Sequence, residues 1–233
     1  MIKKYNQYLK ENIHLDIDPY GEEIWDIDNL SIILQIAKET GKPYDQITNL
    51  YCSNKQLNSL EGIEKLINLQ ELDCNYNRLI SLDGIENLTN LEELRFSGNQ
   101  LTNLDGIENL INLELLNCSY NQLTTLAGIE DLTNLRRLYC NNNQLISLAG
   151  IENLTDLSEL YCIDNQLISL SSIEKLTKLQ ILFCGNNPLM NLNGIENLTK
   201  LKYLYCPNNR FSKEYIDYIK DYCKKKNILL KYD

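Results

Sequence analysis

The chain has 233 residues and carries 32 acidic against 22 basic side chains, which gives a formal net charge of -10. An acidic chain of this kind lacks the electrostatic footprint of a protein that binds nucleic acid or an anionic membrane. No stretch approaches the roughly 18 apolar residues of a membrane-spanning helix. The N-terminal residues lack the apolar core of a signal peptide and no sorting tail follows Tyr232, so we expect a cytoplasmic protein.

Residues 1–46 differ in composition from the rest of the chain and are expected to form an N-terminal helical cap region. One helix is predicted from Ile2 to Glu11, and a second from Leu30 to Thr40, which ends before Gly41. The acidic segment 16–28 between them is interpreted as a solvated loop. Calcium binding by its carboxylates is the alternative, although their spacing does not fit an EF-hand loop.

Residues 47–211 consist of eight units of 22 residues, without insertion or deletion. Each unit begins with a short predicted strand and continues into a return segment, where a glycine permits a tight turn before one turn of 3₁₀ helix. A fixed period of this length predicts a solenoid of stacked parallel strands. The shared motif is Leu-x-x-Leu-x-Cys-x-x-Asn-x-Leu, and its first position falls at Ile47, Leu69, Leu91, Leu113, Leu135, Leu157, Leu179 and Leu201.

One column of the motif holds seven of the eight cysteines, and Phe96 fills the same place in the third unit. An apolar substitute indicates that this column points into the core. Stacked strands separate equivalent residues by about 4.8 Å, more than the Cβ spacing of a disulfide. No histidine or carboxylate converges there to hold a metal. We therefore expect a ladder of reduced, buried thiols at Cys52, Cys74, Cys118, Cys140, Cys162, Cys184 and Cys206.

Two further columns are polar. The asparagine column is predicted to satisfy backbone groups where the chain turns away from the sheet. The glutamate column has too many equivalent members for a catalytic pair, and is predicted to meet free N–H groups at the start of each short helix. The asparagines are Asn77, Asn99, Asn121, Asn143, Asn165, Asn187 and Asn209, and the glutamates are Glu64, Glu86, Glu108, Glu130, Glu152, Glu174 and Glu196.

The Gly-Ile-Glu-x-Leu-Thr-Asn-Leu linkage and the 22-residue units resemble the short leucine-rich repeats of bacterial internalins and of the leucine-rich regulatory subunit of type-1 protein phosphatase. The cysteine column is similar to the ladder of a subset of internalins. The resemblance covers residues 47–211. It implies a curved α/β solenoid with a parallel concave sheet, short 3₁₀ helices or turns on the convex side, helical caps at both ends, and protein binding on the concave sheet.

Residues 212–233 are predicted to form a C-terminal cap helix and a strand. Ser212 is suited to cap the helix, in which apolar residues recur at helical spacing, and residues 228–232 are expected to add the strand. Cys223 is interpreted as a buried residue of this cap. The alternative is a reactive thiol whose pKa is lowered by the three lysines that follow it.

The outward strand positions divide the repeats into two halves. Charged residues occupy the second to fourth units, whereas aromatic and aliphatic residues dominate the fifth to eighth. Exposed aromatic residues near arginine are typical of interface hot spots. We therefore predict a protein-binding patch formed by Leu115, Arg137, Tyr139, Glu159, Tyr161, Ile163, Ile181, Phe183, Tyr203 and Tyr205.

The sequence carries no motif for catalysis or for a cofactor. The single histidine, His14, lies outside the repeats, and no phosphate loop, Cys-x-x-Cys or His-Glu-x-x-His motif is present. We expect a non-enzymatic module without cofactor or metal, which binds another protein as an inhibitor, effector or scaffold. A monomer is favoured over a homo-oligomer. Self-association through the aromatic patch, and an enzyme with its site outside the repeats, are the alternatives.

Overall fold

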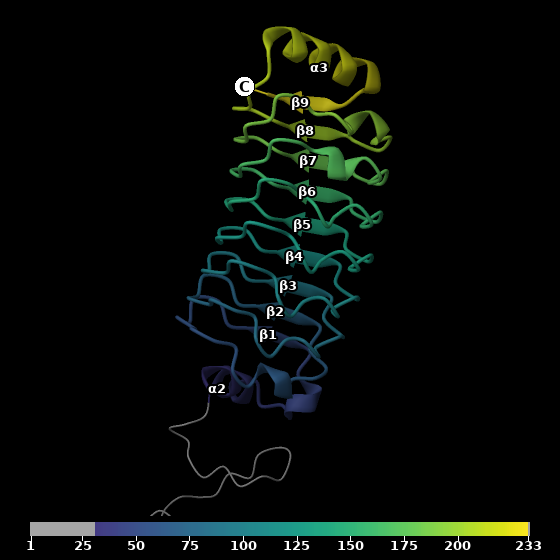
Figure 1. The fold of residues 1–233 in the computed structure, drawn as a ribbon. Coiled ribbons are helices and arrows are strands. Elements are labelled where there is room, and N and C mark those ends of the chain that lie inside the picture. The colour runs from purple at the N-terminus through teal and green to yellow at the C-terminus, as the bar shows by residue number, and fades with distance from the viewer. Residues whose placement is uncertain (1–30, 233) are drawn as a thin grey trace, which may run out of the picture.

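The computed structural model describes residues 31–232, and their core is a single sheet of parallel strands stacked in chain order (Figure 1). Each strand pairs with the equivalent residues of its neighbours, so that Leu138 lies between Leu116 and Leu160. This confirms the predicted α/β solenoid. The nine strands are β1 Asn49–Tyr51, β2 Glu71–Asp73, β3 Glu93–Arg95, β4 Leu115–Asn117, β5 Arg137–Tyr139, β6 Glu159–Tyr161, β7 Ile181–Phe183, β8 Tyr203–Tyr205 and β9 Leu229–Lys231.

The return segments contain turns and short 3₁₀ helices. The 3₁₀ helices are η3 Ile63–Lys65, η4 Ser171–Ile173 and η5 Ile195–Asn197. Among residues 31–232, no helix is both long and apolar enough to cross a membrane.

Two longer helices lie at opposite ends of the stack in Figure 1. Helix α2, Ile32–Glu39, precedes the 3₁₀ helix η2, Tyr44–Gln46. The prediction of a helix from Leu30 was wrong at its start, because the Ser31 hydroxyl accepts a hydrogen bond from the Leu34 N–H at 3.3 Å and caps the helix there. The predicted helix from Ile2 to Glu11 and the acidic segment 16–28 lie outside the described residues.

The core is one continuous apolar cluster from Ile33 of α2 to the C-terminal segment. The inward side chains of each repeat are fully buried, as Leu138 of β5 and Cys140, which follows it, illustrate with 0% exposure. Burial of a leucine contributes about 1.5–3 kcal/mol. Because each repeat shares this core only with its neighbours, the repeats stabilise one another and keep the outward residues in register.

The asparagine column is confirmed as a ladder that joins consecutive repeats. Asn143 Nδ2 donates to the carbonyl of Cys140 in its own repeat at 3.2 Å and to that of Cys118 in the preceding repeat at 3.0 Å. Its Oδ1 accepts from the Leu123 N–H at 3.0 Å. One buried amide thus satisfies backbone groups of two repeats, and the same pattern holds at Asn77, Asn99, Asn121, Asn165, Asn187 and Asn209.

A second asparagine ladder runs along the exposed return side, and the sequence analysis missed it. Its side chains donate to backbone carbonyls of the preceding repeat, or for Asn68 to that of Asp45 before the first repeat, at 2.8–3.3 Å. The 22-residue recurrence of asparagine immediately before the motif was the available signal. The members are Asn68, Asn90, Asn112 and Asn134.

Six members of the glutamate column accept hydrogen bonds from backbone N–H groups as predicted, but not at helix starts in every repeat. The Glu152 carboxylate accepts from the N–H of Gly150 at 2.8 Å, and Gly150 adopts a positive φ of 107°. The middle repeats form turns rather than helices at this point. Where Ser172 replaces the glycine, its hydroxyl donates to Glu152 at 2.7 Å, so this carboxylate links two repeats.

The C-terminal segment consists of α3, Lys213–Lys226, followed by β9. Two tyrosines fix the helix to the return segment of the seventh unit: the Tyr215 hydroxyl accepts from the Leu192 N–H at 2.7 Å, and the Tyr222 hydroxyl donates to the Ile195 carbonyl at 3.2 Å. Asn227 ends the helix in the left-handed conformation. The chain then returns as β9, which extends the sheet beside β8.

Candidate protein-binding face

The outward side chains of β1–β9 form one surface, which we call the strand face. Each strand contributes two outward positions, which recur in two columns because the strands are in register. The first column is Asn49, Glu71, Glu93, Leu115, Arg137, Glu159, Ile181, Tyr203 and Leu229. The second column is Tyr51, Asp73, Arg95, Asn117, Tyr139, Tyr161, Phe183, Tyr205 and Lys231.

Four consecutive aromatic rings of the second column are in contact, the first pair stacked and the other two pairs tilted. We call them the aromatic ladder: Tyr139, Tyr161, Phe183 and Tyr205. The ring centroids are 4.7, 4.8 and 5.2 Å apart in this order, with interplanar angles of 28°, 55° and 33°. These distances suit favourable aromatic contacts. At the end of the ladder, the Lys231 ammonium lies 5.7 Å from the Tyr205 ring centroid. The ladder is therefore a preorganised, half-buried apolar strip.

The ladder also carries neutral hydroxyl groups. The Tyr139 hydroxyl donates to Glu159 Oε2 at 3.2 Å. Burial and the neighbouring Glu159 carboxylate raise the pKa of Tyr139 to about 12. The same two causes raise the pKa of Tyr161. Both phenols therefore remain protonated near neutral pH and present donors beside an apolar surface.

An ion pair lies at the N-terminal end of the predicted patch. The Arg137 guanidinium lies 3.1 Å from Glu93, which also pairs with Arg95. The strand between them carries Leu115, whose side chain is only 4% exposed although it belongs to the outward column. Leu115 therefore offers little contact area, and Arg137 has a partner within the chain.

The remaining predicted site residues lie on or beside the strand face with different exposures. Tyr203 is the most open of them, at 46% exposed, whereas Ile181, Glu159 and Ile163 are half-buried. Ile163 follows β6, next to the aromatic ladder. The structure thus brings the predicted patch together over β4–β8, with Leu115 on β4 at its edge.

The sequence analysis missed two residues of β9. Leu229 is 66% exposed and continues the column of Tyr203, and Lys231 continues that of Tyr205. The alternation of residues 228–232 indicated a strand, but not its register. Together they extend the apolar surface by one strand and end it with a positive charge.

The other half of the strand face is acidic. The Tyr51 hydroxyl donates to Glu71 at 2.7 Å, and this hydrogen bond lowers the pKa of the Glu71 carboxyl. Asp73 accepts from the Asn75 N–H at 3.0 Å and from the Ser53 hydroxyl. The carboxylates are held in place while still reaching the surface, so the two halves of the strand face differ in charge as well as in apolar area.

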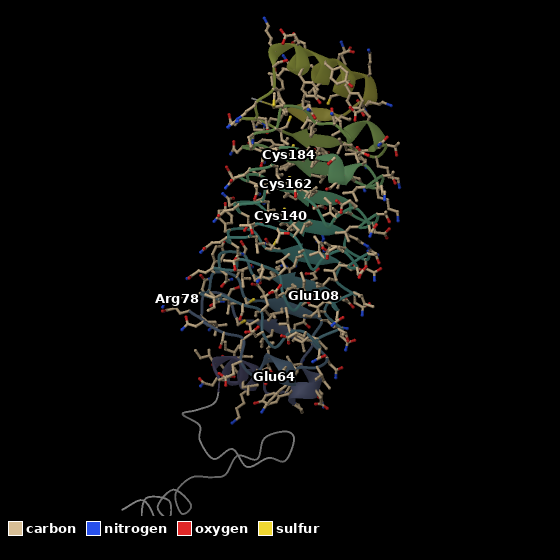
Figure 2. The ribbon with its side chains drawn as sticks, in the orientation of Figure 1. Glu64, Arg78, Glu108, Cys140, Cys162 and Cys184 are labelled. Carbon is tan, nitrogen blue, oxygen red and sulfur yellow. The ribbon has the colours of Figure 1, made fainter. Side chains whose placement is uncertain are left out.

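The cysteines form the expected ladder beneath this face, and Figure 2 shows Cys140, Cys162 and Cys184 in line along the stack. All eight cysteines are buried, and none forms a disulfide. Burial raises the pKa of Cys118 to about 12 and that of Cys223 to about 11. The lysines after Cys223 do not lower its pKa, because the thiol faces the core, so the reactive-thiol alternative is wrong.

Within residues 31–232, no three His, Cys, Asp or Glu side chains lie close enough to hold a metal ion. The thiol of Cys140 instead donates to the backbone carbonyl of Tyr161 at 3.4 Å.

Comparisons with known proteins agree with this architecture. The family model for leucine-rich repeats (2 copies) matches residues 89–132 and 133–176. A leucine-rich repeat protein of Leptospira interrogans is similar at 31% identity with a TM-score of 0.75, over 81% of this chain and 49% of that protein. The chain therefore spans about half the length of this relative.

Two further solved structures are similar at 26% identity. Internalin C2 of Listeria monocytogenes matches with a TM-score of 0.59 over 78% of this chain and 92% of its own. The repeat ectodomain of an Arabidopsis thaliana membrane receptor kinase, solved in complex with Casparian strip integrity factor 2, matches with a TM-score of 0.57 over 64% of this chain and 19% of its own. No curated protein matches significantly. The chain is a leucine-rich repeat protein of the internalin-like, 22-residue class.

Proposed function

We propose that the protein is a non-enzymatic module that binds a partner protein through the C-terminal half of its strand face. The observation that carries this proposal is the aromatic ladder, four rings in contact on consecutive strands with Tyr203 and Leu229 beside them. Leucine-rich repeats commonly serve as protein-interaction modules, and the receptor neighbour was solved with a bound factor. Holding a partner in this way suits an inhibitor, an effector or a scaffold.

The energetics of the ladder support binding. Aromatic side chains dominate interface hot spots because they bury a large area and lose little conformational entropy. The stacking of Tyr161 on both Tyr139 and Phe183 already restricts its ring, so a partner need not immobilise it. The inward residues of β5–β8 form the core, and the outward rings add an apolar strip that a partner is able to cover.

The chemistry of the described residues supports a non-catalytic role. Every cysteine is a buried thiol, and the thiols of Cys118 and Cys223 have raised pKa values, so neither provides a nucleophilic thiolate. The glutamate column is engaged with backbone N–H groups, as Glu152 illustrates. His14, the sole histidine, lies outside the described residues.

Site-specific photo-crosslinking tests the proposal. A benzophenone side chain at Tyr203, on the strand face, is compared with one at Thr133, which is exposed on the return side. In native lysate of the source organism, we expect a defined adduct from position 203 alone, and its loss when Phe183→Ala is added. An adduct of equal strength from position 133 would contradict the proposal. An adduct of twice the mass of the chain would indicate self-association instead, which sedimentation at two concentrations checks.

A further inference from the structure

We infer that the element recognised by the strand face is an amphipathic α-helix that lies along the stack, across the strands. Its apolar stripe covers the aromatic ladder, and its basic residues lie over the acidic half of the face, which comprises β2–β4 and the residue before each of them. This inference rests on the proposed function and specifies the partner. Two independent observations carry it, the spacing of the rings and the division of charge.

The ring spacing matches a helix and not an extended chain. Neighbouring rings of the ladder are 4.7, 4.8 and 5.2 Å apart. Residues on one stripe of an α-helix alternate three and four apart, which is about 5.3 Å per step along the axis. Residues on one face of an extended chain are about 6.7 Å apart. Over the three ring-to-ring steps of the ladder, the summed spacing of residues on a helix stripe differs from that of the rings by about 1 Å. For residues on one face of an extended chain the difference is about 5 Å, which equals the distance between two neighbouring rings.

The charge of the strand face also changes along the stack of strands. The acidic half contains five acidic residues and one basic residue, Arg95; the acidic residues are Glu71, Asp73, Glu92, Glu93 and Glu114. Glu93 and Glu114 also form ion pairs with Arg137 and Arg136 of the next half, so Glu71, Asp73 and Glu92 remain for a partner. In the corresponding positions of β5–β9, four basic residues face the single acidic Glu159; the basic residues are Arg136, Arg137, Lys202 and Lys231. A partner complementary to the whole face therefore changes from basic to apolar along its length.

The dimensions fix the size of the partner helix. From β2 to β8 the sheet advances by six strand spacings of about 4.8 Å, or about 29 Å. An α-helix of about 19 residues spans this length. A second copy of this chain fits less well, because in a symmetric face-to-face dimer the acidic half of one copy would cover either the acidic half or the aromatic ladder of the other, depending on the direction of the two-fold axis, and both copies carry a net charge of -10.

Synthetic peptides test the inference. The probe is a 20-residue peptide held helical by lactam bridges, with leucines on one stripe of its first half and arginines in its second half. A matched peptide of the same composition places the leucines at every second position and has no bridges. A third, helical peptide carries glutamates in place of the arginines. Binding of each labelled peptide to the full chain is measured by fluorescence anisotropy.

We expect the basic helical probe to bind at least ten times more tightly than either of the other peptides. Glu71→Lys combined with Glu92→Lys should weaken this probe at least tenfold and improve binding of the acidic helix. Glu61→Lys, the same change of charge on an exposed residue of the return side, should leave both affinities unchanged. Phe183→Ala should also weaken the basic helical probe at least tenfold. Circular dichroism melts establish that each variant is folded.

Two results would overturn the inference. One is equal or tighter binding of the period-two peptide, and the other is the absence of measurable binding of the basic helical probe up to 1 mM. If the period-two peptide binds and Phe183→Ala abolishes this binding, the strand face still binds protein but not a helix. The crosslinking comparison of positions 203 and 133 tests the proposed function separately, so the two failures are distinguishable.

Discussion

The guanidinium of Arg137 on β5 lies 3.1 Å from the carboxylate of Glu93 on β3, two strands away along the sheet. Neither residue is a neighbour of the other in the strand pairing, because β4 lies between them. The pair therefore spans the strand that carries Leu115 and accounts for the burial of this outward leucine. It also forms the boundary between the acidic half of the strand face and the aromatic ladder.

The first prediction concerns this ion pair. Both side chains are partly exposed, so solvent screening keeps the interaction itself below about 1 kcal/mol. Arg137→Ala should nevertheless lower the free energy of unfolding by about 1 kcal/mol, because it also uncovers Leu115. Arg136→Ala, which removes a more exposed pair with Glu114, should cost about 0.5 kcal/mol or less. Urea denaturation measures the loss of unfolding free energy in each variant. An equal loss in both would mean that covering Leu115 contributes nothing to stability.

The second prediction separates the asparagine ladder from the glutamate column. Asn143→Ala leaves buried backbone groups of two repeats without partners, with an expected cost of about 1–3 kcal/mol. Glu108→Ala removes an exposed hydrogen bond to Gly106, with an expected cost of about 0.5 kcal/mol or less. Glu152→Ala should fall between them, because this carboxylate also accepts from Ser172. Thermal melts in which Glu108→Ala destabilises the chain more than Asn143→Ala would contradict the structural roles given to the asparagine ladder and the glutamate column.

The third prediction uses backbone strain at the end of the strands. Tyr120 has a φ of 54°, in the left-handed region that asparagine tolerates better than tyrosine, and it is 56% exposed. Tyr120→Asn should stabilise the chain by about 0.5–1 kcal/mol. Tyr76 has the same conformation, but its ring lies so close to Gly98 that a Cβ there would be 2.6 Å from Cδ1. Tyr76→Asn should therefore increase the free energy of unfolding by less than Tyr120→Asn. A larger increase for Tyr76→Asn in urea denaturation would contradict this explanation.

The fourth prediction concerns pH and the buried thiols. Burial raises the pKa of Cys118 to about 12 from an ordinary value of 9.0, so the folded chain holds this proton after the unfolded chain has lost it. The free energy of unfolding is therefore unaffected below about pH 9 and falls as the pH rises from there towards 12. At pH 9.5 each fully buried thiol should lower the free energy of unfolding by about 1 kcal/mol.

Urea midpoints at pH 8 and pH 9.5 measure this effect, and the Cys118→Ala variant should show a smaller decline because one titrating group is gone. A midpoint that does not change between the two pH values would show that the thiols titrate alike in both states. A thiol reagent should label few cysteines in the native protein and all eight after unfolding. Disulfides in the intact mass of fresh protein would contradict the reduced ladder.

The repeat made most of the fold predictable. Once Phe96 and the leucines assigned the inward positions of one unit, the period of 22 residues assigned them in every other unit, and the structure confirms them. The start of α2 was not predictable to the residue, because Ser31 and Asp28 are both good caps and the choice depends on packing against the first repeat. The return turns depend on such local contacts as well.

The strand face was predictable only where the period holds. Adding 22 to Tyr205 gives Asn227, yet the structure places Lys231 opposite Tyr205, because α3 lengthens the last crossover. The burial of Leu115 depends on the length of the Arg137 side chain and on a carboxylate two strands away, which the residue types of the column do not reveal. Contacts between strands that are not neighbours, rather than the columns themselves, were the part that needed coordinates.

The last prediction compares two residues of the proposed binding patch that the structure places differently. Phe183 lies inside the aromatic ladder, in contact with Tyr161 and Tyr205, and still reaches the surface. Phe183→Ala should weaken binding of the crosslinked partner by about 2 kcal/mol or more, the size of a hot-spot effect. Its cost in unfolding free energy should stay near 1 kcal/mol, since only outward contacts are lost.

Leu115→Ala should show the reverse behaviour. Its side chain is 4% exposed, so little of it is available to a partner, while its removal leaves a gap beneath the Glu93–Arg137 pair. We expect a cost of about 2 kcal/mol or more in stability and an affinity within a factor of two of the wild type. Calorimetric titration and urea denaturation of both variants measure the four quantities. If Leu115→Ala loses affinity while Phe183→Ala keeps it, the partner opens the ion pair and binds at the middle of the sheet, and the aromatic ladder is not its site.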